Sequence, residues 1–169
     1  MWIMPAIVQA GFLPGNYRKT AGWGASFFTL SSGALKGAWD LKGNLVYEAG
    51  FGGYMGPETA QITFSGTWTQ TIDNTVGVSV PKGIVTVNKS AGSKLSLVGN
   101  ITLSTGQNLN LTSGNIDLMG YTLRVPGTLS ISSGAGIYLN SDSLKVGAAG
   151  TDILPGAYSD GTVYGGAAP

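Results

Sequence analysis

Eight apolar-x-apolar triplets recur between Lys94 and Val146, and this repeat limits the chain to very few folds. Each triplet has the period-2 alternation of a short strand with one buried face. The gaps between triplets hold Gly, Asn, Ser, Thr and Pro, which favour turns. The triplets are Leu95–Leu97, Ile101–Leu103, Leu109–Leu111, Ile116–Leu118, Leu123–Val125, Leu129–Ile131, Ile137–Leu139 and Leu144–Val146. The pattern predicts a series of very short strands separated by tight turns.

Every third triplet repeats at a step of about 21 residues, as from Leu95 to Ile116 to Ile137 and from Leu123 to Leu144. A repeat of this length that contains three strands fits one coil of a stacked solenoid with a roughly triangular cross-section. A β-sandwich is the alternative, but its strands are usually longer and recur every roughly 8–12 residues. We therefore predict an all-β, parallel β-solenoid with about 21 residues and three short strands per coil.

The sequence divides into three parts. Residues 1–24 lack the repeat and begin with an apolar stretch, which predicts an N-terminal cap or a strand that links to a neighbouring molecule. Residues 25–146 form the predicted solenoid, and residues 147–169 form a Gly- and Ala-rich tail. Gly156–Ala168 is a second candidate for the linking strand. The apolar residues of the N-terminal candidate strand are Trp2, Ile3, Met4, Ile7 and Val8.

The composition excludes several classes of function. Charged residues make up 10% of the chain, the net charge is +1, and no run of Lys or Arg occurs. Such a chain offers no electrostatic footprint for nucleic acid or an anionic membrane. It has no His and no Cys, so a His-based triad, a His-ligated zinc and a thiolate site are excluded. No apolar run is long enough to span a membrane. We expect no cofactor and no metal.

The acidic residues do not form a catalytic pattern. Polysaccharide lyases and hydrolases need clustered carboxylates, or a carboxylate beside a basic group. Asp117 is expected to face outward, but one coil away its equivalents are Ser96 and Tyr138. Arg124 and Lys145 are equivalent outward positions with no acidic partner in the pattern. We therefore predict that the protein is not an enzyme and that it has no catalytic residues.

Two outward aromatic residues are candidates for ligand binding. Tyr121 and Tyr138 could stack on a sugar, because an aromatic ring offers a flat amphipathic surface. The structural alternative is that both rings pack between coils. This alternative stays open at the level of the sequence.

Three phrases follow one another along the chain, Ala60–Ile72, Ile84–Gly92 and Leu111–Leu118. They resemble the repeats of large secreted surface proteins of Bacteroidetes-type bacteria, which are similar to filamentous haemagglutinin-like adhesins. The resemblance covers roughly Phe27–Val146, and it implies a β-helix that is extracellular or on the cell surface. Family members are usually longer, and many end in a sorting domain that Thr151–Pro169 does not resemble. Asp142-Ser143-Leu144 resembles an O-glycosylation signal of such exported proteins, which makes Ser143 a candidate site.

These observations predict a structural extracellular protein whose partners are copies of itself. The end coils of a solenoid expose unpaired backbone groups, so copies could join by head-to-tail stacking or strand addition into a surface fibre or filament. The alternative is an adhesin or carbohydrate-binding module of a larger surface protein, with surface glycans as partners.

Overall fold

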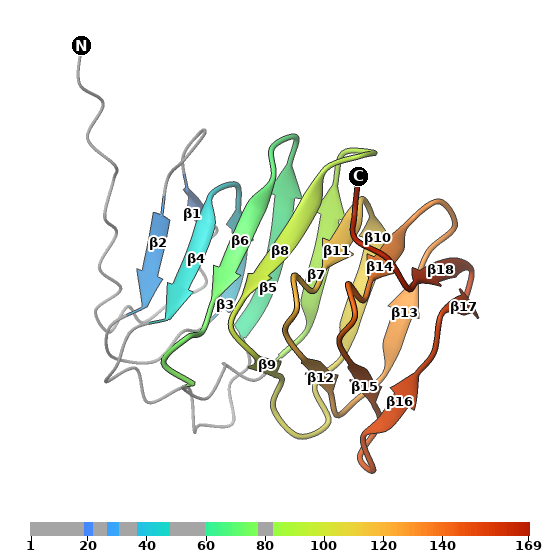
Figure 1. Ribbon diagram of the computed structural model, residues 1–169. Coiled ribbons are helices and arrows are strands. Elements are labelled where there is room, and N and C mark those ends of the chain that lie inside the picture. The colour runs from blue at the N-terminus through green and yellow to red at the C-terminus, as the bar shows by residue number, and fades with distance from the viewer. Residues whose placement is uncertain (1–18, 22–26, 31–36, 48–59, 78–82) are drawn as a thin grey trace.

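The computed structural model describes residues 19–21, 27–30, 37–47, 60–77 and 83–169. Every regular element in these ranges is a β-strand, and most strands pair in parallel. Figure 1 shows the strands lying side by side in coils that follow one another in chain order. The prediction of an all-β, parallel β-solenoid is confirmed. The candidate strand Trp2, Ile3, Met4, Ile7 and Val8 lies outside the described residues.

Three sheets surround one core. Sheet A contains β1 (Lys19–Ala21), β3 (Gly37–Leu41), β5 (Ala60–Gly66), β7 (Val85–Lys89), β10 (Leu109–Ser113) and β13 (Leu129–Ile131). Sheet B contains β2 (Phe27–Leu30), β4 (Asn44–Tyr47), β6 (Gln70–Asp73), β8 (Lys94–Val98), β11 (Asn115–Asp117), β14 (Gly136–Tyr138), β17 (Gly156–Tyr158) and β18 (Gly161–Tyr164). Sheet C contains β9 (Ile101–Thr102), β12 (Leu123–Val125), β15 (Leu144–Val146) and β16 (Thr151–Ile153).

The register of the strands follows the step of about 21 residues that the sequence indicates. Leu95 pairs with Ile116, and Ile116 pairs with Ile137, in neighbouring strands of sheet B. Leu123 pairs with Leu144 in sheet C in the same way. Equivalent apolar residues therefore lie directly above one another, and each coil completes the buried surface of the next.

The core is a continuous column of aliphatic side chains that runs through the stacked coils. Leu111, Leu118 and Ile131 have no exposed surface, and neither does Phe64 in a coil nearer the N-terminus. Each buried side chain of this size contributes roughly 1.5–3 kcal/mol to stability through the hydrophobic effect. The alternating triplets thus hold the coils together by burial, and the backbone ladders fix their spacing.

Asparagine side chains at the corners join one coil to the next. In each case the side-chain oxygen accepts a hydrogen bond from the backbone N–H of a residue in the following coil. The pairs are Asn44–Thr71, Asn100–Thr122 and Asn108–Thr128, with N···O distances of 2.8, 2.9 and 2.8 Å. These bonds satisfy corner N–H groups that the parallel ladders leave without a strand partner.

The chain reverses direction at the C-terminal end of the solenoid. Strand β16 pairs antiparallel with β15, and β17 pairs antiparallel with β18, which itself continues sheet B beside β14. Gly161 permits this arrangement, because a Cβ there would lie 2.2 Å from Cγ2 of Ile131. Most of the predicted second linking strand, Gly156–Ala168, therefore pairs within its own chain.

Within the described ranges, no helix is long and apolar enough to cross a membrane.

Candidate functional site

A polar groove crosses the outer face of sheet A over strands β3, β5 and β7. Its volume is about 400 Å³. The groove is lined by Ala38, Trp39, Asp40, Gln61, Thr63, Ser65 and Asn88. Trp39 is only 5% exposed, so its ring belongs to the core and offers no open face to a ligand.

The alternation of β5 explains why polar side chains reach this groove. Ile62 and Phe64 point into the core and are buried, so the residues between and beside them point outward. Thr63 and Ser65 are consequently half-buried on the outer face.

The polar positions form a continuous row across sheet A. Asp40 pairs with Thr63, and Thr63 pairs with Thr86 in the next coil. The row continues through Asn110 to Ser130 at the other end of the sheet. Neighbouring strands lie about 4.8 Å apart, so hydroxyl and amide groups recur along the solenoid axis at that spacing.

Asp40 is the only charged residue in the described part of the chain that lines the groove. Its Oδ1 atom accepts a hydrogen bond from Oγ of Ser65 at 2.5 Å. On the opposite side, Oδ1 of Asn88 accepts a hydrogen bond from Oγ of Ser113 at 2.9 Å. The second carboxylate oxygen of Asp40 and the amide group of Asn88 are thus the atoms that these residues present to a ligand.

The two predicted ligand-facing tyrosines lie in different surroundings. Tyr138 is on β14, and its ring stacks on Tyr164 with a centroid distance of 4.5 Å and an interplanar angle of 15°. Tyr121 follows the turn after Leu118 and packs against the core. Burial raises the pKa of the Tyr138 phenol, and the nearby Tyr164 and Asp117 raise it further.

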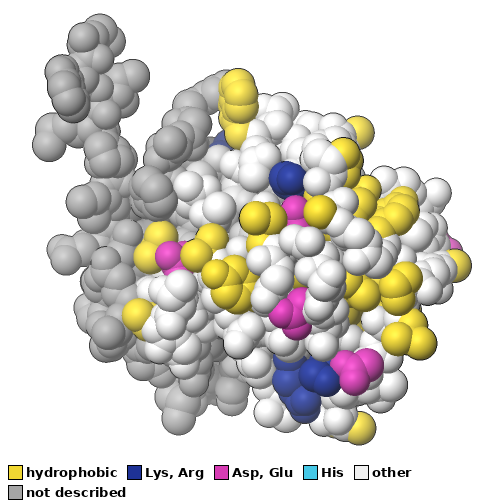
Figure 2. Space-filling model, viewed as in Figure 1, with side chains coloured by type: hydrophobic (Ala, Val, Ile, Leu, Met, Phe, Trp, Pro, Cys, Tyr) yellow, Lys and Arg dark blue, Asp and Glu magenta, His cyan; other side chains and the backbone are white. Residues whose placement is uncertain are grey.

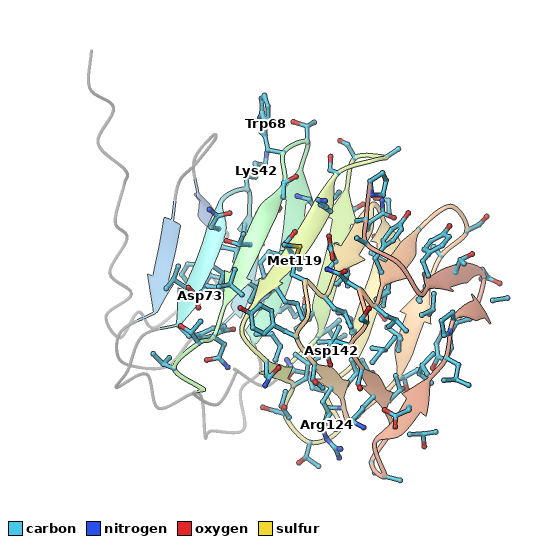
Figure 3. All side chains as sticks on the ribbon, in the orientation of Figure 1. Lys42, Trp68, Asp73, Met119, Arg124 and Asp142 are labelled. Carbon is cyan, nitrogen blue, oxygen red and sulfur yellow. The ribbon has the colours of Figure 1, made fainter. Side chains whose placement is uncertain are left out.

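Asp117 occupies the outward register position that the sequence predicts, between Ser96 and Tyr138. However, its side chain is only 2% exposed. Its Oδ2 atom lies 3.5 Å from Nζ of Lys94, and its Oδ1 atom accepts the backbone N–H of Met119 at 3.1 Å. The Lys94 ammonium also donates to the Pro169 carbonyl at 3.3 Å, which brings the C-terminal residues to this face of sheet B. Figure 3 shows Met119 near the middle of that face.

Sheet C carries the two basic residues that the repeat places in register. Arg124 pairs with Lys145 as predicted. The expectation that they lack an acidic partner is wrong for Lys145, because the antiparallel strand β16 brings Asp152 to 2.7 Å from its Nζ atom. Arg124 instead donates to the Ala148 carbonyl at 2.9 Å. In Figure 2 basic and acidic side chains meet at the lower edge of the molecule, and charge is otherwise sparse on this face.

Ser143 lies immediately before β15, where it is half-buried. Its backbone N–H donates to Oδ1 of Asp142 at 2.6 Å, and the same oxygen accepts a hydrogen bond from Oγ1 of Thr122. The aspartate therefore has a structural role at this corner. O-glycosylation of Ser143 stays a prediction.

A second polar cluster lies inside the solenoid. Lys89 is 2% exposed, and its ammonium donates to Oε1 of Gln70 at 2.5 Å. The Gln70 amide donates in turn to the Leu41 carbonyl at 2.9 Å and to the Gly43 carbonyl. Burial lowers the pKa of Lys89 to about 8. Every buried side-chain polar atom of this cluster has a hydrogen-bond partner. Its hydrogen bonds therefore link three coils, those of Leu41, Gln70 and Lys89.

No family model, curated protein or solved structure matches the chain. Among the described residues, no group of three or more carboxylate side chains is placed to hold a metal ion. The groove presents hydrogen-bonding side chains and, among the described residues, one carboxylate.

Sequence reasoning did not identify this groove. The strands before Val80 are separated by unequal loops, so the repeat gives no register there. A usable signal is present in Thr63-Phe64-Ser65 and Thr86-Val87-Asn88, in which two polar residues flank one apolar residue. Aligning these triplets with Asn110-Leu111-Thr112 would have predicted the outward polar row.

Proposed function

We propose that this protein is a structural subunit of an extracellular or cell-surface fibre, and that copies join end to end through sheet A. The observation that carries this proposal is the difference between the sheets at the C-terminal end. Sheets B and C end there in antiparallel strands, whereas sheet A ends in the parallel strand β13. A parallel edge strand is a template on which a further parallel strand can pair.

The outer edge of β13 has groups available for such pairing. In a parallel ladder, alternate residues direct their backbone groups to opposite neighbours, so Leu129 and Ile131 face away from β10. The Ile131 carbonyl accepts the Asp160 N–H at 3.0 Å, which occupies one end of this edge. No strand of the described chain pairs with this side of β13.

At the opposite end of sheet A, strand β1 pairs with β3 on one side, and no other described strand pairs with it. Joining β13 of one copy to β1 of the next would continue the sheet in the same direction. A head-to-tail contact of this kind does not close on itself, so it would produce a filament.

Two properties of the sequence support a location outside the cell. The chain has few charged residues and many hydroxyl side chains, as in extracellular fibres. Its repeat phrases also resemble those of exported bacterial surface proteins.

The alternative joint is strand addition by N-terminal residues, which lie outside the described ranges. These residues are Trp2, Ile3, Met4, Ile7 and Val8.

Negative-stain electron microscopy with sedimentation velocity tests the proposal. The wild-type protein should form thin filaments of uniform width, and Ser130→Lys should suppress them, because a lysine on an edge strand opposes pairing. Ser130 is exposed, so the variant should fold normally. Thr105→Lys, at an exposed turn away from the edge, is the matched control and should still form filaments.

A wild-type protein that stays monomeric over the full accessible concentration range would contradict the proposal. Deleting residues 1–10 distinguishes the joint through β13 from the joint by N-terminal strand addition. Loss of filaments in the deletion variant, with Ser130→Lys unaffected, would assign the joint to strand addition instead of to β13.

A further inference from the structure

We infer that the groove on sheet A binds an uncharged, linear polysaccharide. This activity is separate from end-to-end assembly, because the groove lies on the side of the solenoid and crosses β3, β5 and β7. The inference rests on the shape of the groove, the hydrogen-bonding groups that it presents and its charge.

The shape favours a small part of a longer molecule. A volume of about 400 Å³ lies within the range of sites for small ligands. Beyond the groove, the outward polar row continues through Thr86, Asn110 and Ser130, so a bound chain can extend along the solenoid axis over this row.

The groups in the groove complement sugar hydroxyls. A hydroxyl both donates and accepts, so it is best bound where donors and acceptors lie close together. Asp40 supplies an acceptor, and the amide of Asn88 supplies a donor. The amide of Gln61 and the hydroxyl of Thr63 can do both.

The charge of the groove favours neutral polysaccharides over anionic ones. Among the described residues, Asp40 is the only ionisable group in the lining, and no basic side chain of these residues lines the groove. An anionic polysaccharide would bring its carboxylates or sulfates towards Asp40 with no cation to bind them. A neutral polysaccharide has no such penalty, and its hydroxyl groups can donate to the carboxylate.

The groove also differs from the tyrosine faces predicted from the sequence. The stacked Tyr138 and Tyr164 offer aromatic surface, but they are on strands β14 and β18 of sheet B and do not line the groove. Sugar binding on sheet A therefore depends on hydrogen bonds, and removal of either tyrosine ring should leave it intact.

Affinity gel electrophoresis tests the inference. The full chain is run in native gels that contain hydroxyethylcellulose, xyloglucan, glucomannan or mixed-linkage glucan, and in gels that contain polygalacturonate. At least one neutral polysaccharide should retard the wild-type protein, and polygalacturonate should retard it at least tenfold less at equal concentration.

Two Thr→Tyr substitutions, one inside the groove and one outside it, test whether the groove is the binding site. Thr63→Tyr places a ring in the groove and should weaken retardation at least tenfold. Thr102→Tyr places the same ring on an exposed position of β9 and should bind as the wild type does. Circular dichroism of both variants verifies that they fold. The inference is overturned if no neutral polysaccharide retards the wild type, if Thr63→Tyr binds normally, or if polygalacturonate binds equally well.

Discussion

The ammonium group of Lys89 donates a hydrogen bond to the side-chain oxygen of Gln70 inside the solenoid, and the two atoms are 2.5 Å apart. Lys89 is almost completely buried, and no carboxylate of the described chain forms an ion pair with it. A cation in the core is therefore held by a neutral amide, whose own N–H groups donate to backbone carbonyls of an earlier coil.

The stability of the protein should increase with pH above neutrality because of Lys89. Its pKa is lowered to about 8 in the folded protein, against 10.5 for a free lysine side chain. Between these values the unfolded state binds more protons, so the free energy of unfolding rises with pH. Urea unfolding should show a rise of about 2 kcal/mol between about pH 7 and about pH 9.5.

Two substitutions check that Lys89 causes this rise. Lys89→Met should flatten the pH profile, whereas Lys42→Met, at an exposed lysine, should leave the slope unchanged. The measurement must stop below about pH 10, because burial raises the pKa of Tyr47 and the folded protein loses stability once unfolded tyrosines ionise. A flat wild-type profile would show that the Lys89 ammonium is not destabilised by burial.

Replacing Gln70 should destabilise the protein strongly. Gln70→Met removes the hydrogen-bond acceptor of the Lys89 ammonium and leaves a buried cation without a partner. We expect a loss of at least about 2 kcal/mol at neutral pH, measured by urea unfolding. The double variant Gln70→Met/Lys89→Met should recover much of this loss, because it removes the charge as well. Equal stability of the single and double variants would contradict this explanation.

Leu111→Asp should abolish folding. Leu111 has no exposed surface and lies in the apolar column between Val87 and Ile131. A carboxylate there would be buried without a partner, which costs several kcal/mol. Circular dichroism should show loss of the β-sheet signal. Asn110→Asp, which adds the same carboxylate one residue away on the outer face, should keep that signal.

The C-terminal hairpin should be sensitive to Gly161. In Gly161→Val, the new side chain would meet Ile131 and the carbonyl oxygens of Ser132 and Ala135. Overpacking of this kind costs about 1–3 kcal/mol. Hydrogen exchange of residues 156–164 should accelerate, with little change in β7 or β10. Gly166→Ala, where a Cβ meets no atom within 4 Å, is the control and should exchange as the wild type does.

The regular half of the fold could be predicted because its register is repeated in the sequence. Leu95, Ile116 and Ile137 share one step, and a strand that slipped by one residue would turn its apolar side chains outward. Near the N-terminus the apolar positions recur at unequal spacings in the sequence, so Trp39 and Phe64 could not be placed from spacing alone.

The C-terminal strands and the groove were harder to predict for different reasons. Gly156–Tyr164 contains no apolar-x-apolar triplet, and its strands depend on the edge that β14 offers. The groove depends on which residues of different coils lie beside one another, as Asp40 and Ser65 do. The outward polar row leaves a pattern in the triplets, but the contact between Asp40 and Ser65 joins two coils and leaves none.

The asparagines that bond to the following coil have a consequence for how such a molecule can change size. Asn100 and Asn108 each accept a hydrogen bond from a backbone N–H one coil away, so a duplicated coil would carry its own asparagine acceptor and find a backbone donor for it. Gene duplication could therefore lengthen the molecule by about 4.8 Å per added coil while both ends stay the same. Evolution can therefore change the length of the solenoid one coil at a time, and the packing of the core stays the same.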